Sequence, residues 1–360
     1  MQKIIFYYGC FDPINNSHIK IATEALKLIN GDKLYFGLKK GPNSINLAPF
    51  FKRKKMLELA ISDKKHFGFL NIKFEYKDLD KTFDLLAGNI SNENEYYILM
   101  DEMDLEIWNK ANLIKQKVKF IINGSYFSNT SSECLYLNNK GDISYNEDRK
   151  NILKNINPKV KKYIIKNNIY LEQRLKYYLS AKRIKHVKSV KSLGLKIYRN
   201  NKESLARNDV VTACLLHDIA REYPLVKLKN IIKRHYPDKI NEKGYILHQY
   251  VGEYIAKKKF YIEDRNILEA IKYHTTAEAN ISKLAKLVFV SDKLDPLRDY
   301  DTSSLTNKCI ENLESGFIEV LKDKIEYSIK HDEIKTLSES TKRAISYYLK
   351  GDIKDVGIDY

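Results

Sequence analysis

Two residues able to bind a metal ion or move a proton follow an apolar run in the second half of the chain. His217 and Asp218 come directly after residues 213–216, which read Ala-Cys-Leu-Leu. A buried helix at this point would hold an imidazole and a carboxylate side by side inside a helical bundle. A second pair of the same type, His331 and Asp332, lies among charged residues, so we expect that pair on the surface.

Four more residues with metal-binding side chains lie in or beside helical patterns with apolar neighbours: His186, His248, His274 and Asp292. An isolated buried polar group costs free energy, so a bundle rarely buries four histidines and two aspartates without a function. Imidazoles and carboxylates suit iron, manganese, zinc or cobalt. The alternative is that some of these histidines only satisfy hydrogen bonds in the core.

The six residues are enough to hold two metal ions, with Asp218 placed to bridge them. Two neighbouring ions would bind a shared water, lower its pKa toward roughly 7 and clamp a phosphate for in-line attack. The sequence therefore predicts a phosphohydrolase site in which Asp218 is also catalytic. The predicted metal ligands are His186, His217, Asp218, His248, His274 and Asp292.

The order of these residues and their flanks resemble the HD-domain phosphohydrolases, most closely the bacterial branch that hydrolyses diadenosine tetraphosphate symmetrically to two ADP. RIKH (183–186) resembles that branch's R-[YF]-x-H opening, and LLHDIAREYP (215–224) its L-L-H-D-I-A-K-[ED] segment. IKYHTT (271–276) matches I-x-x-H-T-T, and SDKLDPLR (291–298) resembles A-D-[KY]-I-E-P-x-R. The resemblance covers about residues 175–325, with Arg221 in place of Lys and Asp295 in place of Glu.

This resemblance implies a pair of divalent metals, with iron expected first and manganese or another metal as the alternative. It implies that Arg183, Arg221 and Arg298 bind the polyphosphate and that Thr275 and Thr276 shape the pocket. The substrate would be diadenosine tetraphosphate. An alarmone or a nucleoside triphosphate stays open as the alternative substrate.

A phosphate-binding loop is the second candidate site, at the start of the chain. Residues 3–26 read as a strand, a glycine turn and a helix. Gly9 would let the backbone approach a phosphate closely, while Phe11 and Asp12 would fix the turn. His18 starts the helix, where unpaired N–H groups and the helix dipole favour anions. The alternative is an ordinary strand-to-helix turn capped by Ser17.

The same segment resembles the HxGH nucleotidyltransferases, specifically bacterial nicotinate-nucleotide adenylyltransferase, whose opening is G-G-x-F-D-P-x-H-x-G-H. YGCFDPINNSH (8–18) keeps FDP and the second histidine, His18, but has Asn15 and Ser17 in place of the first histidine and the glycine. FKRKKMLELAI (51–61) matches the family's R-x-x-M-L pattern, and LMDEMDLEIW (99–108) its G-x-D-x-[LM]…W stretch with Asp101. ISYNEDR (143–149) stands where the family has I-S-S-T-x-I-R. The resemblance covers about residues 1–170.

This second resemblance implies adenylyl transfer from ATP, with magnesium, to nicotinate mononucleotide in NAD biosynthesis. His18 and Arg149 would stabilise the phosphates and Asn15 would assist, while Ser144 and Asp101 would contact the nucleotide. Asn15 can donate a hydrogen bond but cannot carry a proton's charge. The alternative is therefore a degenerate nucleotide-binding module beside a single active site, the HD hydrolase.

The periodicity along the chain indicates how these sites are positioned. Up to about residue 170, strand patterns at 3–8, 33–38, 71–74, 96–100, 117–122 and 134–137 alternate with helical ones, which predicts a parallel sheet with crossover helices. Helical patterns alone continue from residue 171. We therefore expect an α/β Rossmann-like nucleotidyltransferase domain (1–170), an all-α HD bundle (171–330) and a charged helical extension that packs only on the surface (331–360).

Composition limits the class of protein. The length of 360 residues fits two domains of about 150 residues each. The net charge of +17 suits nucleotide partners, but the lysines are scattered, so a nucleic-acid partner is not expected and RNA binding is only a minor alternative. No apolar run approaches the roughly 18 residues of a membrane helix, and a signal peptide is not evident. Four distant cysteines predict a cytoplasmic protein without disulfides; a homo-oligomer stays open.

Overall fold

The fold is described from a computed structural model. It describes residues 1–39, 47–74, 88, 90–101, 118–124, 134–137, 150–331 and 337–349. The chain divides into two compact units, Met1–Ile164 and Ile165–Tyr360.

The first unit contains a six-stranded sheet in the order β3-β2-β1-β4-β5-β6, and every neighbouring pair of strands is parallel. Parallel strands are covered on both faces, which explains the continuous apolar runs in the sequence. The predicted parallel sheet is confirmed. The strands are β1 (Lys3–Gly9), β2 (Lys33–Lys39), β3 (Phe67–Phe74), β4 (Glu95–Asp101), β5 (Val118–Asn123) and β6 (Cys134–Leu137).

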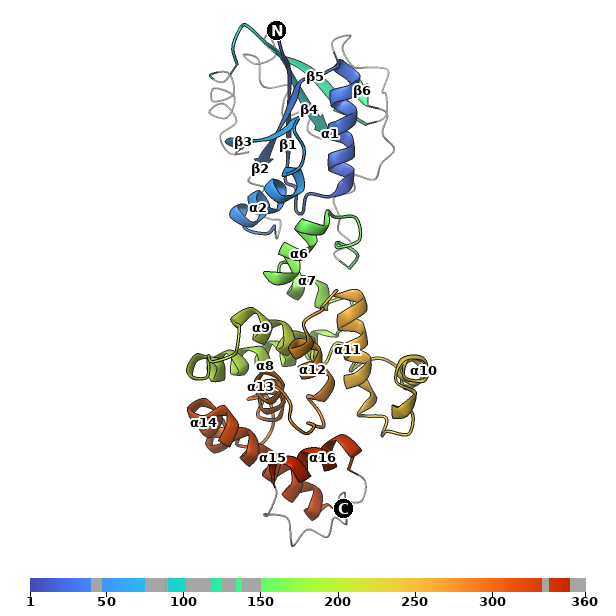
Figure 1. The fold of residues 1–360 in the computed structure, drawn as a ribbon, viewed down its shortest axis with the longest axis vertical. Helices are drawn as coiled ribbons and strands as arrows, with labels where there is room; N and C mark the ends of the chain where they lie inside the picture. The colour runs from blue at the N-terminus through green and yellow to red at the C-terminus, as the bar shows by residue number, and fades with distance from the viewer. Residues whose placement is uncertain are drawn as a thin grey trace. The chain divides into compact units, whose positions relative to one another are not determined.

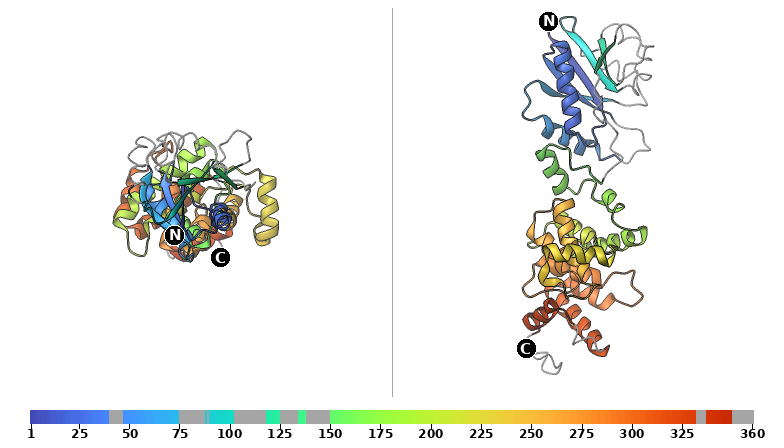
Figure 2. Two further views of the ribbon diagram at one scale, coloured as in Figure 1. Left: turned by 90° about the horizontal axis from the view of Figure 1, so that it is seen from above. Right: turned by 90° about the vertical axis from the view of Figure 1, so that its right-hand side faces the viewer.

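Among the described residues, the helices of this unit are α1 (Asn16–Ile29), α2 (Phe50–Ile61) and α6 (Pro158–Lys166), the last of which crosses the division between the units. α1 lies along one face of the sheet (Figure 1; Figure 2). The strand order reverses next to β1, because β2 pairs with one edge of β1 and β4 with the other. Ligands of open parallel sheets bind outside the carboxyl ends of the strands at such a point. The turn that follows Gly9 lies there.

The second unit is helical, and among its described residues there is no strand. Its helices pack around one continuous apolar core that extends from Leu171 to Leu349. A Cβ at Gly194 would meet the Sγ of Cys214 at 2.9 Å, so glycine lets α8 approach α9 closely. The helices are α7 (Leu171–Leu175), α8 (Ala181–Asn200), α9 (Arg207–Leu216), α10 (Leu225–His235), α11 (Leu247–Lys259), α12 (Arg265–Tyr273), α13 (Lys283–Lys293), α14 (Ser303–Glu311), α15 (Leu313–Lys330) and α16 (Glu339–Tyr348).

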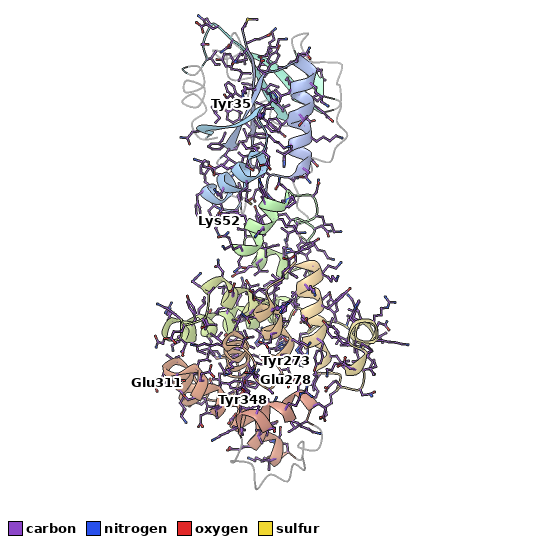
Figure 3. The ribbon with its side chains drawn as sticks, in the orientation of Figure 1. Tyr35, Lys52, Tyr273, Glu278, Glu311 and Tyr348 are labelled. Carbon is purple, nitrogen blue, oxygen red and sulfur yellow. The ribbon has the colours of Figure 1, made fainter. Side chains whose placement is uncertain are left out.

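The end of the chain differs from the expectation of a surface extension. Ala344 and Ile345 in α16 are buried in the core. The hydroxyl of Tyr348 accepts a hydrogen bond from the backbone N–H of Ile281, and Arg343 pairs with Glu278 (Figure 3). Within α16 the charged residues Glu339, Lys342 and Arg343 lie on the outer face of an amphipathic helix, which composition alone does not reveal.

Within the part of the chain that the structure describes, no helix has the length and apolar character to cross a membrane. All four cysteines are free, as the sequence predicted.

Candidate metal centre and nucleotide loop

Six side chains that the sequence singled out converge in the helical unit. Helices α8, α11 and α13 each contribute one of them, and the turns that follow α9 and α12 contribute the others. All are buried except His186, which is half-buried. They are His186, His217, Asp218, His248, His274 and Asp292.

Asp218 lies at the centre of this cluster. Its Oδ2 is 3.6 Å from Nε2 of His186 and 3.7 Å from Nε2 of His217, whereas its Oδ1 is 3.2 Å from Nε2 of His248 and 3.4 Å from Nε2 of His274. In each of these two groups of three, the ligand atoms all lie within 4.8 Å of one another. Each carboxylate oxygen thus faces its own pair of imidazoles, as a bridging ligand would require.

Asp292 joins the first of these groups. Its Oδ1 is 3.4 Å from Nε2 of His186 and 3.7 Å from Nε2 of His217. The first position therefore offers two imidazoles and two carboxylates, counting Asp218. The second offers two imidazoles and the shared carboxylate.

The opposite ring nitrogens of three histidines contact backbone carbonyls. Nδ1 of His217 lies 2.8 Å from the carbonyl oxygen of Cys214. Nδ1 of His248 lies 2.7 Å from the carbonyl oxygen of Tyr245, and Nδ1 of His274 lies 2.7 Å from that of Ile271. A carbonyl only accepts hydrogen bonds, so Nδ1 of His217 and Nδ1 of His274 are the protonated donors and their Nε2 atoms keep the lone pairs. Nδ1 of His248 also lies 3.1 Å from a guanidinium nitrogen of Arg221, which only donates, so its contacts do not fix a single tautomer. These three carbonyls, each three residues before its histidine, therefore aim the Nε2 atoms at the cluster.

Asp295 orients the fourth histidine. Its Oδ2 is 2.6 Å from Nδ1 of His186, and its side chain is buried. A carboxylate behind a metal-binding histidine holds the ring and makes it a stronger ligand. The sequence marked Asp295 only as a replacement for Glu within SDKLDPLR, and the spacing of three residues from Asp292 gave no indication of this contact.

The residues present fit divalent metal ions. Nε2 of His186 and Nε2 of His217 are buried without a hydrogen-bond partner, which costs free energy unless a ligand takes up the lone pairs. Nε2 of His248 and Nε2 of His274 lie 3.0 Å apart. This spacing places both nitrogens within reach of one metal ion.

The protonation states support the same conclusion. Burial lowers the pKa of His217 to about 4 and also lowers the pKa of His274, so both imidazoles are neutral at pH 7. Burial lowers the pKa of His186 as well, but Asp292 and Asp295 outweigh burial and raise it. Burial alone would raise the pKa of Asp218, yet the surrounding imidazoles, His217 first, hold it well below its usual range.

The three predicted arginines lie beside the cluster. Arg183 donates to Oδ2 of Asp218 at 2.8 Å, and Arg298 lies 3.3 Å from Oδ1 of Asp292 and donates to its carbonyl. Arg221 donates to the carbonyl of Tyr245 at 2.9 Å. All three line a cavity of about 750 Å³ that also contains the cluster.

The two predicted threonines differ in environment. Oγ1 of Thr275 lies 3.0 Å from Nε2 of His274 and thus at the cluster. Thr276 is buried, accepts a hydrogen bond from Gln249 and accepts another from Thr341 through its carbonyl. It also lines the cavity and links α11 and the turn after α12 to α16. The cavity also contains a lysine that sequence patterns did not single out, Lys324 of α15.

The loop after β1 forms the second candidate site. Asn15 caps α1: its Oδ1 accepts from the backbone N–H of His18 at 3.0 Å, and its own N–H donates to Nδ1 of His18 at 3.1 Å. Nδ1 of His18 is therefore an acceptor, and the ring proton lies on Nε2. Burial lowers the pKa of His18 to about 4. The helix cap thus belongs to Asn15, whereas Ser17 accepts a hydrogen bond from Asn155.

Gly9 and Phe11 support His18. A Cβ at Gly9 would meet the ring of Phe11 at 2.8 Å, and that ring packs edge-on against His18, with the centroids 5.2 Å apart. Oδ1 of Asp12 accepts from the N–H of Ala48 at 3.1 Å. Phe11 and Asp12 therefore hold the loop in position through these contacts.

Arg53 of α2 joins this loop to the sheet. It is buried and donates to the carbonyls of Cys10, Lys39 and Ala48 at 2.6, 2.9 and 3.0 Å. Its role in the described contacts is to fix the loop. Ser144 and Arg149 lie outside the described residues, and only the backbone of Asp101, at the end of β4, is described.

Comparison with known proteins matches both halves. The HD domain model matches residues 183–297, and the cytidylyltransferase-like model matches residues 6–134. A protein of Mycoplasma genitalium, named a probable nicotinate-nucleotide adenylyltransferase/Ap4A hydrolase, is 30% identical over 354 residues, which cover 89% of this chain and 97% of the relative. This chain belongs to that family. Both predicted resemblances and the predicted fold class are confirmed.

Other members of the two families match one half each. The symmetrical bis(5'-nucleosyl)-tetraphosphatase of Bacillus subtilis is 28% identical over 127 residues, 34% of this chain and 67% of the relative. The probable nicotinate-nucleotide adenylyltransferase of Endomicrobium trichonymphae is 27% identical over 197 residues, 47% of this chain and 100% of the relative. The HD domain is a family of metal-dependent hydrolases, and the cluster around Asp218 could bind a metal.

Proposed function

We propose that the helical unit hydrolyses diadenosine tetraphosphate symmetrically to two ADP with a pair of divalent metal ions. The observation that carries this proposal is the position of Asp218, whose two oxygens each face the Nε2 atoms of a pair of imidazoles. When bound, the ions would lower the pKa of a water and polarise the phosphate under attack. Iron is expected first, with manganese as the alternative.

Different residues of the chain would bind the metal ions, orient the ligands and bind the phosphates. One ion would be held by His186, His217, Asp218 and Asp292, and the other by Asp218, His248 and His274. The backbone carbonyls and Asp295 keep the imidazoles aimed at the cluster, so no reorganisation is needed when substrate binds. The arginines would bind phosphate oxygens at the edge of the cavity, with Arg183 and Arg298 already held in place by Asp218 and Asp292.

Substrate size and charge support a polyphosphate. Of the described residues that line the cavity, eight are lysine or arginine and three are aspartate. Such an excess of positive charge attracts a polyanion. The volume of about 750 Å³ lies within the range of cofactor-sized ligand sites.

The test is hydrolysis by anaerobically purified protein, with metal content measured on the same sample. Diadenosine tetraphosphate should give ADP alone, since a cut away from the centre would give AMP and ATP. An alarmone and a nucleoside triphosphate, assayed in parallel with iron and with manganese, test the alternative substrates. A metal-containing sample that turns over either of them faster than diadenosine tetraphosphate would reassign the substrate.

We also propose that the first unit transfers an adenylyl group from ATP, with magnesium, to nicotinate mononucleotide. The supporting observation is the loop at the reversal point of the sheet, in which Nδ1 of His18 is occupied and its Nε2 proton is left as a donor. Little covalent chemistry is required of the protein in this reaction, so positioning and hydrogen bonds to the phosphates dominate. Arg149 and Ser144 would add to phosphate binding.

A binding module without catalysis is the alternative for this unit. It is favoured by Asn15, because its side-chain oxygen is engaged in capping α1 and no imidazole stands there. Incubating the protein with ATP, magnesium and nicotinate mononucleotide distinguishes the two. Pyrophosphate release that depends on nicotinate mononucleotide supports the enzyme, and ATP binding without release supports the module.

A further inference from the structure

Lys324 lies in the cavity wall but outside the residues that match the HD domain, which end at 297. It belongs to α15, which packs against α13, the helix that carries Asp292. Its ammonium donates a hydrogen bond to the carbonyl of Thr275 at 2.9 Å and lies 5.6 Å from the centroid of the Phe289 ring. The side chain is half-buried, so its position is fixed by these contacts.

Among the described residues, Lys324 differs from three neighbouring cations because it is not paired with a carboxylate. Arg183, Lys293 and Arg298 each pair with Asp218 or Asp292 of the cluster. Among the described residues, no carboxylate lies within ion-pair distance of the Lys324 ammonium. One carbonyl uses one of its three N–H groups. Burial lowers the pKa of Lys324 to about 7. A ligand anion in this cavity would stabilise the ammonium form and gain from meeting it.

Tyr327 lies one helical turn further along α15 and lines the same cavity. Its side chain is 59% exposed, and its ring stacks on that of His331, with the centroids 4.0 Å apart and an angle of 24° between the planes. His331 is itself held by a hydrogen bond to the carbonyl of Tyr327. A flat ring that is both supported from behind and open to a cavity is suited to stack against a nucleobase.

We infer that α15 supplies a nucleoside-diphosphate subsite in which Lys324 binds phosphate and Tyr327 stacks on the base. Residues three apart on a helix lie about 5–6 Å from each other, a spacing that a nucleotide can bridge from its phosphates to its base. This inference rests on the proposed hydrolase function, because the ligand would be one half of the dinucleotide. It adds to the active site a helix that lies beyond the matched HD domain.

Binding of ADP and of adenosine to the full chain, purified with its own metal, tests the subsite by calorimetry. Lys324→Met keeps the aliphatic stem against Phe289 and should weaken ADP binding about tenfold while leaving adenosine unchanged, as expected for loss of a charge-assisted contact. Tyr327→Ala should weaken both ligands about tenfold, because it removes the stacking surface. Lys324→Arg and Tyr327→Phe should retain most of the affinity.

Lys330→Met is the matched control, because Lys330 is an exposed lysine of the same helix that does not line the cavity. It should bind both ligands as the parent does. Thermal unfolding of each variant identifies any that fails to fold. If Lys324→Met or Tyr327→Ala does not fold, Lys324→Gln is compared with Lys324→Arg, and Tyr327→Leu is compared with Tyr327→Phe.

The outcomes separate this inference from the proposed function. Suppose that the parent hydrolyses diadenosine tetraphosphate, and that Lys324→Met and Tyr327→Ala equal it in ADP affinity and in KM for the dinucleotide. The subsite assignment is then wrong and the proposed function stands. If the parent binds ADP and the variants lose affinity as described, yet no dinucleotide is cut, the subsite stands and the function is wrong. A parent that does not bind ADP overturns the subsite directly.

Discussion

The two candidate sites are built in opposite ways. The loop of the first unit is one continuous stretch, from Gly9 to His18, in which the backbone and a helix cap position the imidazole. The centre of the second unit takes its six side chains from five separate places in the chain. The first therefore depends on local geometry, and the second depends on the packing of the whole helical core.

The difference also extends to charge. His18 is a single neutral imidazole beside an aromatic ring. Four imidazoles and two ionised aspartates share the second site, with Asp295 behind one histidine. A site of the first kind suits phosphate recognition by hydrogen bonds, whereas the second has the charge and the free lone pairs to hold metal ions. Four experiments test whether the two sites differ in this way.

The largest effect is expected from Asp218→Ala. Removing the shared carboxylate should lower diadenosine tetraphosphate hydrolysis by roughly 10³-fold or more and reduce the bound metal, because both metal positions lose a ligand. Adenylyl transfer should not change. Asp238→Ala, which removes an exposed carboxylate paired with Lys239, is the control. Parent-level hydrolysis by a metal-free Asp218→Ala sample would rule out the bridging role.

His18→Ala tests the other site. Loss of the Nε2–H donor should lower adenylyl transfer by about 10² to 10³-fold, the usual range for a lost donor to a developing charge. Hydrolysis by the second unit should stay at the parent level. His66→Ala, in which an exposed histidine of the same unit is removed, provides the comparison. Unchanged transfer in His18→Ala would leave the loop without a catalytic imidazole.

The pH dependence of folding provides a smaller effect in the first unit. Because burial lowers the pKa of His18 to about 4 from the ordinary 6.5, the unfolded chain binds the proton first as the pH falls. Stability is therefore full above pH 6.5 and is lost between pH 6.5 and 4. After allowance for partial exposure, this loss is about 1 to 2 kcal/mol. Urea unfolding at pH 7 and pH 4.5 should show a smaller loss of unfolding free energy for His18→Gln than for the parent. An equal loss in the two proteins would contradict a buried neutral ring.

The smallest effect is expected from the helix cap. Asn15→Ala should destabilise the first unit by about 1 kcal/mol, because the N–H of His18 loses its acceptor. Ser180→Ala removes the corresponding cap of α8, where Ser180 accepts from Arg183, and should cost a similar amount in the second unit. Asn15→Asp retains an acceptor and should unfold with the parent. Equal stability of Asn15→Ala and the parent would show that the cap contributes nothing.

Much of this molecule follows from sequence patterns alone. Alternating strand and helix patterns determined the parallel sheet, and the short-range signals around Gly9 and His18 determined the strand, turn and helix, because these depend on residues close in the chain. The ordered histidines and aspartates determined which side chains to look for, since each has an apolar flank that directs it inward.

How these residues act together depends on the packing of the folded chain. Which Asp218 oxygen faces which imidazoles, the carbonyls that fix the tautomers, and the contact between Asp295 and His186 all depend on the relative positions of packed helices. The burial of α16 and the position of Lys324 in the cavity wall also depend on how the helices pack. A local pattern fixes the direction of a side chain on its own helix, but distances across a core follow from how all of the helices fill space.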